Sequence, residues 1–147
     1  MGFEHKVTAR FYEVDQVGIV FFGRIFEFCH QAFEEMLAAA FDDPTYAFAG
    51  PRSKASWGAP LVHAEADFRS PIRHGDRIGI TVVLAEVSER TLTFRYRLSN
   101  AEARVCANAT LIHSVIDRAS FRPCPVPDEL LAALAGLGVF AGEELGS

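Results

Sequence analysis

An aspartate stands a few residues before the expected start of a long helix, an arrangement that could cleave an ester or a thioester. Asp15 lies in the turn-like segment from Glu13 to Val20, and the spacing of the following residues predicts a helix from about Phe22. The first amides of a helix have no acceptor within it, and the helix dipole adds partial positive charge there. The amides of Phe22 and Gly23 could therefore hold the oxyanion that forms when the Asp15 carboxylate, or water that it activates, attacks a carbonyl.

Simpler interpretations exist for Asp15 and for two histidines. Aspartate is common in turns because its side chain accepts local hydrogen bonds, and Gly18 is expected to adopt a positive φ without taking part in chemistry. His30 borders the apolar stripe of the expected helix, so we expect a half-buried structural role, although its ring could also touch an acyl group. His63 lies on the polar face of an expected strand, where a role at an interface or in solvent is favoured. Neither histidine has a partner that indicates a His-dependent triad.

Hydrophobic spacing predicts one long helix over residues 22–41. Its apolar stripe covers roughly half of the circumference, which is more than a surface helix needs, so we expect a sheet to wrap one side of it. Phe28 projects toward the polar side, where an exposed phenylalanine suits a subunit contact or a pocket wall. Trp57 precedes the next strand and is expected to line the pocket.

Five segments alternate between apolar and polar residues as half-buried strands do: 5–12, 60–69, 77–86, 91–98 and 103–115. Short turns near residues 75–76, 88–89 and 100–102 join the last four, which predicts an antiparallel meander. A final helix is expected over residues 126–134, after the breaker Pro123-Cys124-Pro125. One long apolar helix and five one-sided strands predict an α+β domain whose sheet curls around the helix.

Length and composition limit the class of protein. The chain has 147 residues, 50% hydrophobic and 22% charged, so we expect one domain over 1–147, with a core at about 5–135 and a C-terminal tail beyond. The net charge of −5 argues against nucleic acid as a partner, because phosphate binding needs a basic surface. The three cysteines lack zinc-ligand spacing, and no apolar run reaches the roughly 18 residues that cross a bilayer. We therefore expect a cytoplasmic protein without a metal, a redox cofactor or a membrane partner.

The stretch from Asp15 to Phe28 reads DQVGIVFFGRIFEF. An aspartate, two residues, Gly-Ile-Val and then aromatic residues that open a helix resemble the signature of the 4-hydroxybenzoyl-CoA thioesterase family. Further similar segments are Gly58–Val62, Phe68–Asp76 and Arg122–Pro127, so that the resemblance covers most of residues 5–135. The Asp-x-x-Gly motif alone is weak, but the strand–turn–helix context and the later landmarks in order make the resemblance fairly specific.

This resemblance implies a hotdog fold and an acyl-CoA thioesterase in which Asp15 is the catalytic nucleophile or general base. The backbone amides of Phe22 and Gly23 would form the oxyanion hole. The resemblance also implies a dimer or a dimer of dimers with the active site between protomers, and coenzyme A only as part of the substrate. The residues that we expect to contact this substrate are Gly18, Phe21, Phe26, His30, Trp57, Ala59, Pro60 and Leu61.

Two positions depart from the family pattern. Phe22 stands where some members have His or Tyr, so only its backbone amide can serve there. The basic residues that some relatives place at the third hairpin are reduced to Arg90. Arg69, Arg73 and Lys54 are the other candidates for the CoA phosphates, although such arginines are more often solvated surface residues.

Three classes of function are consistent with these residues. The favoured one is hydrolysis of an acyl-CoA whose acyl group is aromatic or of short to medium length, because the mouth of the expected site is rich in phenylalanine. The second is a non-catalytic module that binds acyl-CoA or an acyl carrier, which would release no thiol. The third is a hotdog dehydratase for 3-hydroxyacyl thioesters, which usually pairs a histidine with a carboxylate and would form an alkene.

Overall fold

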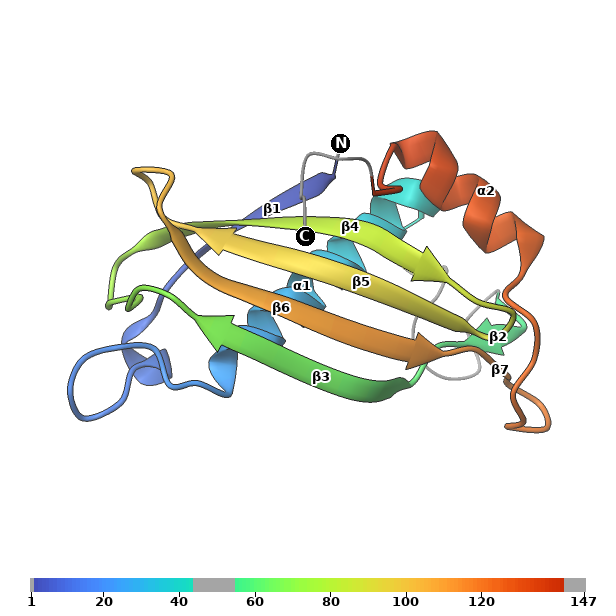
Figure 1. Ribbon diagram of the computed structural model, residues 1–147, viewed down its shortest axis with the longest axis horizontal. Helices are drawn as coiled ribbons and strands as arrows, with labels where there is room; N and C mark the ends of the chain where they lie inside the picture. Colours follow the sequence, from blue (N-terminus) through green and yellow to red (C-terminus); the bar gives the residue numbers. More distant parts are fainter. Residues whose placement is uncertain (1, 44–54, 142–147) are drawn as a thin grey trace.

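Five antiparallel strands form one sheet, and the long helix α1 (Arg24–Phe41) crosses its inner face (Figure 1). The computed structural model describes residues 2–43 and 55–141. The sheet has the order β1-β4-β5-β6-β3, and a two-stranded ladder pairs β2 with β7. The strands are β1 (Phe3–Thr8), β2 (Trp57–Gly58), β3 (Leu61–Phe68), β4 (Arg77–Val87), β5 (Thr91–Ser99), β6 (Val105–Ser114) and β7 (Ile116–Asp117). This architecture confirms the predicted α+β hotdog fold.

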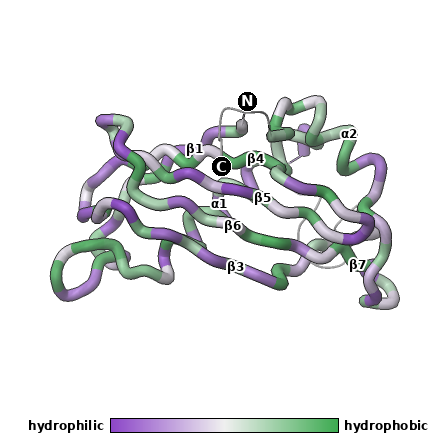
Figure 2. Tube along the Cα trace, viewed as in Figure 1, coloured by the Kyte–Doolittle hydropathy of each residue, from purple (hydrophilic) through white to green (hydrophobic). Residues whose placement is uncertain are grey.

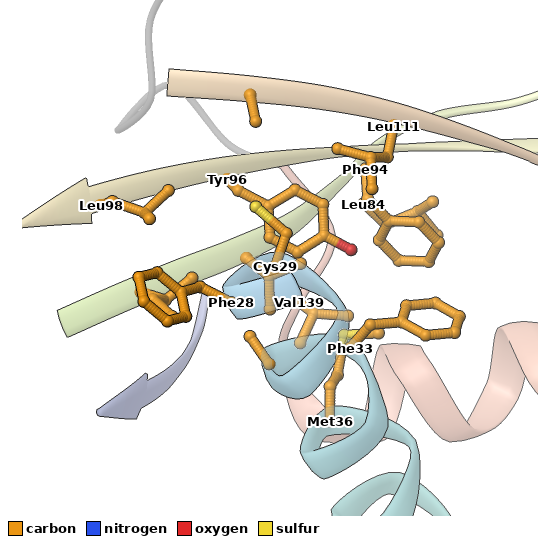
Figure 3. Close-up of a cluster of buried hydrophobic side chains, with 14 of the residues drawn as sticks. Phe28, Cys29, Phe33, Met36, Leu84, Phe94, Tyr96, Leu98, Leu111 and Val139 are labelled. Carbon is orange, nitrogen blue, oxygen red and sulfur yellow. The ribbon is translucent and has the colours of Figure 1, made fainter. Parts of the chain in front are cut away.

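The helix α1 forms because its apolar residues recur at helical spacing and are buried against the sheet. Gly23 precedes its first turn, and Asp42, with a left-handed φ of 51°, ends it. Figure 3 shows Cys29 of this helix beside the ring of Tyr96 from β5, with Phe33 and Met36 farther along the helix. The buried residues of α1 are Ile25, Phe28, Cys29, Ala32, Phe33, Met36 and Leu37.

The prediction that Phe28 is exposed is wrong, because only 1% of the residue is accessible. The helical wheel placed Phe28 outside the stripe that faces the main sheet. In the folded chain β1 passes along that side of α1, and Phe28 and Val7 line the same small hollow. A sheet that curls around a helix buries a wider arc than one flat sheet does.

The predicted four-strand meander is correct for β4, β5 and β6 but wrong for β3, which pairs with β6 instead of β4. Residues 69–76 therefore connect β3, at one edge of the sheet, to β4, which lies next to the strand at the opposite edge, β1. Alternation of residue types shows that a segment is a strand, but it does not identify the neighbouring strand. As an edge strand, β3 is exposed along nearly all of its length.

The first strand is shorter than predicted. It ends at Thr8, and residues Phe11–Glu13 form one turn of 3-10 helix. The backbone amide of Arg10 donates to the carboxylate of the buried Glu13 at 2.8 Å, which turns the chain away from the sheet. Phe11, which was expected on the apolar face of the strand, is consequently exposed.

The second helix, α2 (Asp128–Leu137), begins two residues later than predicted and packs against α1. Gly138, with a φ of 76°, ends it. Val139 is fully buried and its carbonyl accepts a hydrogen bond from the amide of Leu84, so packed residues continue beyond position 135. Neither described helix has the length and apolar character needed to cross a membrane.

Candidate active site

Asp15 lies in a tight turn that its own side chain stabilises. One carboxylate oxygen, Oδ1, accepts hydrogen bonds from the backbone amides of Val17 at 2.9 Å and Ile19 at 3.4 Å. The amide of Asp15 donates to the carbonyl of Ile19 at 2.7 Å, and Gly18 has the expected positive φ of 84°. The turn-forming role of Asp15 is therefore present. The second oxygen, Oδ2, has no hydrogen-bond partner among the described residues, so it remains available for a substrate or water.

The segment before α1 leaves two backbone amides free. The amide of Phe21 donates to the carbonyl of Glu13, whereas those of Phe22 and Gly23 have no acceptor within the described part of the chain. The carbonyls of Phe21 and Phe22 accept from the amides of Arg24 and Ile25, so the first helical turn begins directly after the free amides. These are the two amides that the sequence suggested as oxyanion donors, and that role stays a prediction.

Asp15 and Phe22 line the same hollow, which has a volume of about 790 Å³ and which we call the Asp15 hollow. Pockets of this size are typical of small-molecule sites. The end of β3 and the residues that follow it also line the hollow. Figure 2 shows that much of the loop carrying Asp15 is hydrophobic. The lining residues are Asp15, Gln16, Val17, Ile19, Val20, Phe21, Phe22, Ile25, Phe68, Arg69, Ser70, Pro71, Ile72 and Cys106.

Five of the expected substrate-binding residues line a second hollow of about 590 Å³, which we call the Leu61 hollow. These residues are Phe26, His30, Ala59, Pro60 and Leu61. The two hollows use opposite ends of β3, because Phe68 lines one and Leu61 lines the other. Within one protomer, the expected site is thus divided between two surfaces.

Other residues that the sequence suggested lie apart from both hollows. Gly18 shapes the turn but lines neither of them, and Trp57 is buried in the core. His63 is exposed, and its Nε2 lies 2.7 Å from the carboxylate of Glu65.

Of the candidates for CoA phosphates, only Arg69 lines the Asp15 hollow. Arg73 is exposed beside the turn of Asp15, since its backbone forms a bridge with Ile19. Arg90 lies at the turn between β4 and β5, where its Nε is 4.0 Å from Oε1 of Glu89. Lys54 lies outside the described residues.

Four residues that line these hollows or a third one were not identified as site residues from the sequence. His113 and Tyr96 line the Leu61 hollow, and the spacing did contain a signal for His113, because position 113 continues the inward series of Leu111 and Val115. Arg95 and Arg97 share a third hollow with Arg69 on the outer face of the sheet. Their clustering depends on the pairing of β3 with β6, which alternation alone does not reveal.

The buried thiols of Cys29 and Cys106 are poor candidate nucleophiles. Burial raises the pKa of the Cys29 thiol to about 12. The pKa of Cys106, which lines the Asp15 hollow, is also raised, mainly by burial and by the nearby Asp76. Both thiols are therefore protonated near neutral pH and are weak nucleophiles. In the described ranges, no group of three or more His, Cys, Asp or Glu side chains could hold a metal ion.

An antiparallel sheet packed on one long helix, with a carboxylate-bearing turn just before that helix, places the protein in the class of hotdog-fold thioester hydrolases. The family model of the thioesterase-like superfamily matches residues 9–134. The chain belongs to this superfamily, and it is a thioester hydrolase.

Named relatives support this assignment. The chain is 32% identical over 138 residues to a 1,4-dihydroxy-2-naphthoyl-CoA hydrolase of Nostoc punctiforme, covering 89% of this chain and 85% of the relative. It is 30% identical over 126 residues to an enzyme of the same name from Acaryochloris marina, covering 84% and 89%. The crystal structure of a 1,4-dihydroxy-2-naphthoyl-CoA thioesterase from Synechocystis matches with a TM-score of 0.79 and 26% identity, covering 94% of this chain and 98% of that one.

Proposed function

We propose that this thioester hydrolase cleaves an acyl-CoA to the free acid and coenzyme A, with Asp15 as nucleophile or general base. The observation that carries the proposal is that Asp15, whose Oδ2 is free, and Phe22, whose amide is free, line one hollow. Gly23, whose amide is also free, follows Phe22 directly but does not itself line the hollow. A nucleophile or base beside oxyanion donors is the minimum apparatus for acyl transfer.

The chemistry follows from this arrangement. Either Oδ2 of Asp15 attacks the thioester carbonyl, or the carboxylate takes a proton from water that attacks it. The negative charge that develops on the carbonyl oxygen is held by the amides of Phe22 and Gly23. The carbon–sulfur bond then breaks and coenzyme A leaves as a thiolate that takes up a proton. On the first route, water subsequently hydrolyses the mixed anhydride and frees the Asp15 carboxylate.

The acyl group is proposed to be aromatic. Phe21 and Phe22 are exposed at the mouth of the Asp15 hollow, with ring centroids 4.6 Å apart, and Phe26 and Phe33 line the Leu61 hollow. Apolar walls with few polar groups suit a flat ring. The relatives from Nostoc punctiforme and Acaryochloris marina are named as hydrolases of an aromatic acyl-CoA, which favours the same substrate class here.

A dimer is proposed to complete the site. The edge strand β3 exposes Leu61, Val62 and Phe68 together with unpaired backbone groups, which favours pairing with a second copy. Antiparallel pairing of β3 with itself sets its Leu61 end beside the Phe68 end of the other copy. The Leu61 hollow of one protomer would then adjoin the partner's Asp15 hollow, with the thioester in one and the acyl group reaching the other.

Arginines on the outer face of the sheet are proposed to bind the CoA phosphates. Arg69 lines both the Asp15 hollow and a neighbouring hollow of about 500 Å³ that Arg95 and Arg97 also line. If the CoA part of the substrate extends from the thioester past Arg69, its phosphates meet three arginines. Guanidinium groups match phosphate geometry well. We call this set the arginine hollow.

The test is a panel of CoA esters, from acetyl and decanoyl to benzoyl and phenylacetyl, assayed by thiol release on the wild type and on Asp15→Asn. Asparagine retains the oxygen that accepts from Val17, so the turn should persist while the charge is lost. Turnover should fall about 10²-fold or more, the usual scale for a general base or nucleophile.

Asp117→Asn is the matched control, because Asp117 also caps a turn by accepting from the amide of Ser120. It should leave turnover unchanged. A correctly folded Asp15→Asn protein with full activity would refute the role of Asp15. A 3-hydroxyacyl-CoA added to the panel tests the dehydratase, because loss of its hydroxyl as water to give an alkene, without release of free acid, would indicate that activity.

A further inference from the structure

Two residues that line the Leu61 hollow each carry a buried polar atom with no hydrogen-bond partner among the described residues. These atoms are the hydroxyl of Tyr96 and Nε2 of His113, on residues that are 1% and 4% exposed. Buried polar groups in native proteins are nearly always hydrogen-bonded, so two unpartnered ones at one cavity call for a specific explanation.

The imidazole of His113 has a defined tautomer. Its Nδ1 lies 2.7 Å from the carbonyl oxygen of Ala59, which can only accept, so Nδ1 carries the proton. Burial and the nearby His30 lower the pKa of His113, which keeps the ring neutral, although the bond to Ala59 opposes this shift. Nε2 is therefore a hydrogen-bond acceptor.

The ring of His113 is also held in place. It stacks on Phe33 with centroids 4.5 Å apart and an interplanar angle of 9°. The ring of Phe94 lies nearly perpendicular to it, with the two centroids 5.7 Å apart. Few other orientations are compatible with these contacts, so Nε2 is pre-organised to receive a donor.

Tyr96 supplies the complementary group. Burial, together with the neighbouring Cys29, raises the pKa of its phenol well above the usual value, so the hydroxyl keeps its proton and can donate. Figure 3 shows this hydroxyl within a cluster of apolar side chains, with Cys29 beside the ring. Two residues in the wall of the Leu61 hollow thus carry one unpartnered donor and one unpartnered acceptor, buried among apolar side chains.

We propose that Tyr96 and His113 together bind a hydroxyl group carried by the acyl part of the substrate. That hydroxyl would accept a hydrogen bond from Tyr96 and donate one to Nε2 of His113. Among polar substituents, a hydroxyl satisfies both atoms because it donates and accepts at once. Because the two atoms are buried, side chains of the hollow must move to admit the substrate. His30 and Leu61, which also line the hollow, are exposed, and rotation of such side chains on binding is common. This inference rests on the proposed acyl-CoA hydrolysis and deepens it, because it makes the two residues determinants of specificity.

The test compares benzoyl-CoA with its 2-, 3- and 4-hydroxy derivatives on the wild type and on Tyr96→Phe, which removes one oxygen and preserves the ring. The wild type should prefer at least one hydroxylated isomer. Tyr96→Phe should lower kcat/KM for that isomer about tenfold or more, because it leaves the bound hydroxyl without its donor, and should change benzoyl-CoA less than about twofold. Tyr12→Phe, which removes an exposed hydroxyl, is the control.

A second variant and a structure make the outcome decisive. His113→Phe retains a ring against Phe33 and should abolish the same preference. A crystal structure with the preferred hydroxybenzoate should place its hydroxyl between Tyr96 and His113. An ordered water between the two residues that stays in place when the hydroxybenzoate binds elsewhere would overturn the inference.

The kinetic results separate this inference from the function on which it rests. Hydrolysis of benzoyl-CoA with equal losses for all four esters in Tyr96→Phe, or no preference in the wild type, would overturn the inference alone. Failure of the wild type to release thiol from any CoA ester would overturn the proposed function, and this inference with it.

Discussion

At the scale of single residues, Asp15 uses its two carboxylate oxygens differently. Oδ1 accepts from the amides of Val17 and Ile19, and this local capping holds the side chain in one rotamer. In the proposed reaction, Oδ2 would then act without the entropy loss of ordering a free side chain at each encounter. A turn-forming role and a catalytic role therefore support each other, and the simpler interpretation of the sequence does not exclude the chemical one.

His113 gives a pH dependence of stability that can be measured. Burial lowers its pKa below the usual 6.5, so below about pH 6.5 the unfolded chain binds more protons than the folded one. The free energy of unfolding should therefore fall as the pH decreases from 6.5 toward the folded pKa, by at most about 1.4 kcal/mol per pH unit from this residue. Above pH 6.5 its contribution is constant.

Urea unfolding of the wild type and of His113→Phe at pH 7.5 and pH 5.5 measures this contribution. The variant should lose less stability between the two pH values, because it has no group to protonate at this position. His63→Ala is the control, since the exposed His63–Glu65 pair contributes little to stability. Equal pH dependence in the wild type and His113→Phe would show that His113 protonates as easily in the folded chain as in the unfolded one.

At the scale of elements, local patterns predicted which segments are helices and strands but not how the strands are ordered. The alternation in β4, β5 and β6 reflects a sheet with one buried face, and Ile78, Ile80 and Val82 are all buried as expected. The position of β3 beside β6 depends on contacts between residues far apart in the chain, which a period of two cannot encode. Phe28 was misplaced for the same reason, because β1 returns to cover the side of α1.

The same limit applies to the candidate site. Asp15 and Phe22 are close in sequence and line one hollow, so a local motif was sufficient to group these two residues. Arg95 and Arg97 lie on β5, whereas Arg69 follows β3, and only the intervening β6 brings them to one surface. Residues that converge through strand order must be found in three dimensions.

The arginine hollow yields a prediction about the outer face of the sheet. Arg95→Ala and Arg97→Ala should each raise KM for benzoyl-CoA several-fold, because loss of one phosphate contact removes about 1 kcal/mol or more of binding. Neither should affect benzoyl-N-acetylcysteamine, a thioester without phosphates. Arg122→Ala, an exposed arginine before α2, is the matched control. Equal KM changes for both thioesters would place the phosphates elsewhere.

At the scale of the whole molecule, one active site could combine the Asp15 hollow with the Leu61 hollow of the same protomer or with that of a second copy. Leu61 and Phe68 are at opposite ends of β3, roughly 23 Å apart at the usual rise per residue, although the helix α1 contributes neighbouring residues, Ile25 and Phe26, to the two hollows. In the proposed two-fold dimer through β3, both copies would use the same patch, and each site would combine the Asp15 hollow of one copy with the Leu61 hollow of the other.

Mixing two inactive variants distinguishes a shared site from one within a single protomer. Asp15→Asn removes the carboxylate, and Leu61→Trp fills the second hollow, so each homodimer should be nearly inactive. In a mixed dimer one site has both defects and the other has neither. Equal amounts that exchange subunits freely form mixed dimers half of the time, so activity should recover to about a quarter of the wild-type value.

Circular dichroism and sedimentation of each variant must first show a folded dimer, which excludes loss of activity through misfolding or dissociation. Variants mixed without subunit exchange are the control and should remain inactive. If both hollows belonged to the same protomer, every subunit in the mixture would carry one defective half, and no exchange could restore a site. Recovery after exchange therefore requires that β3 joins the carboxylate of one copy to the acyl-binding surface of the other.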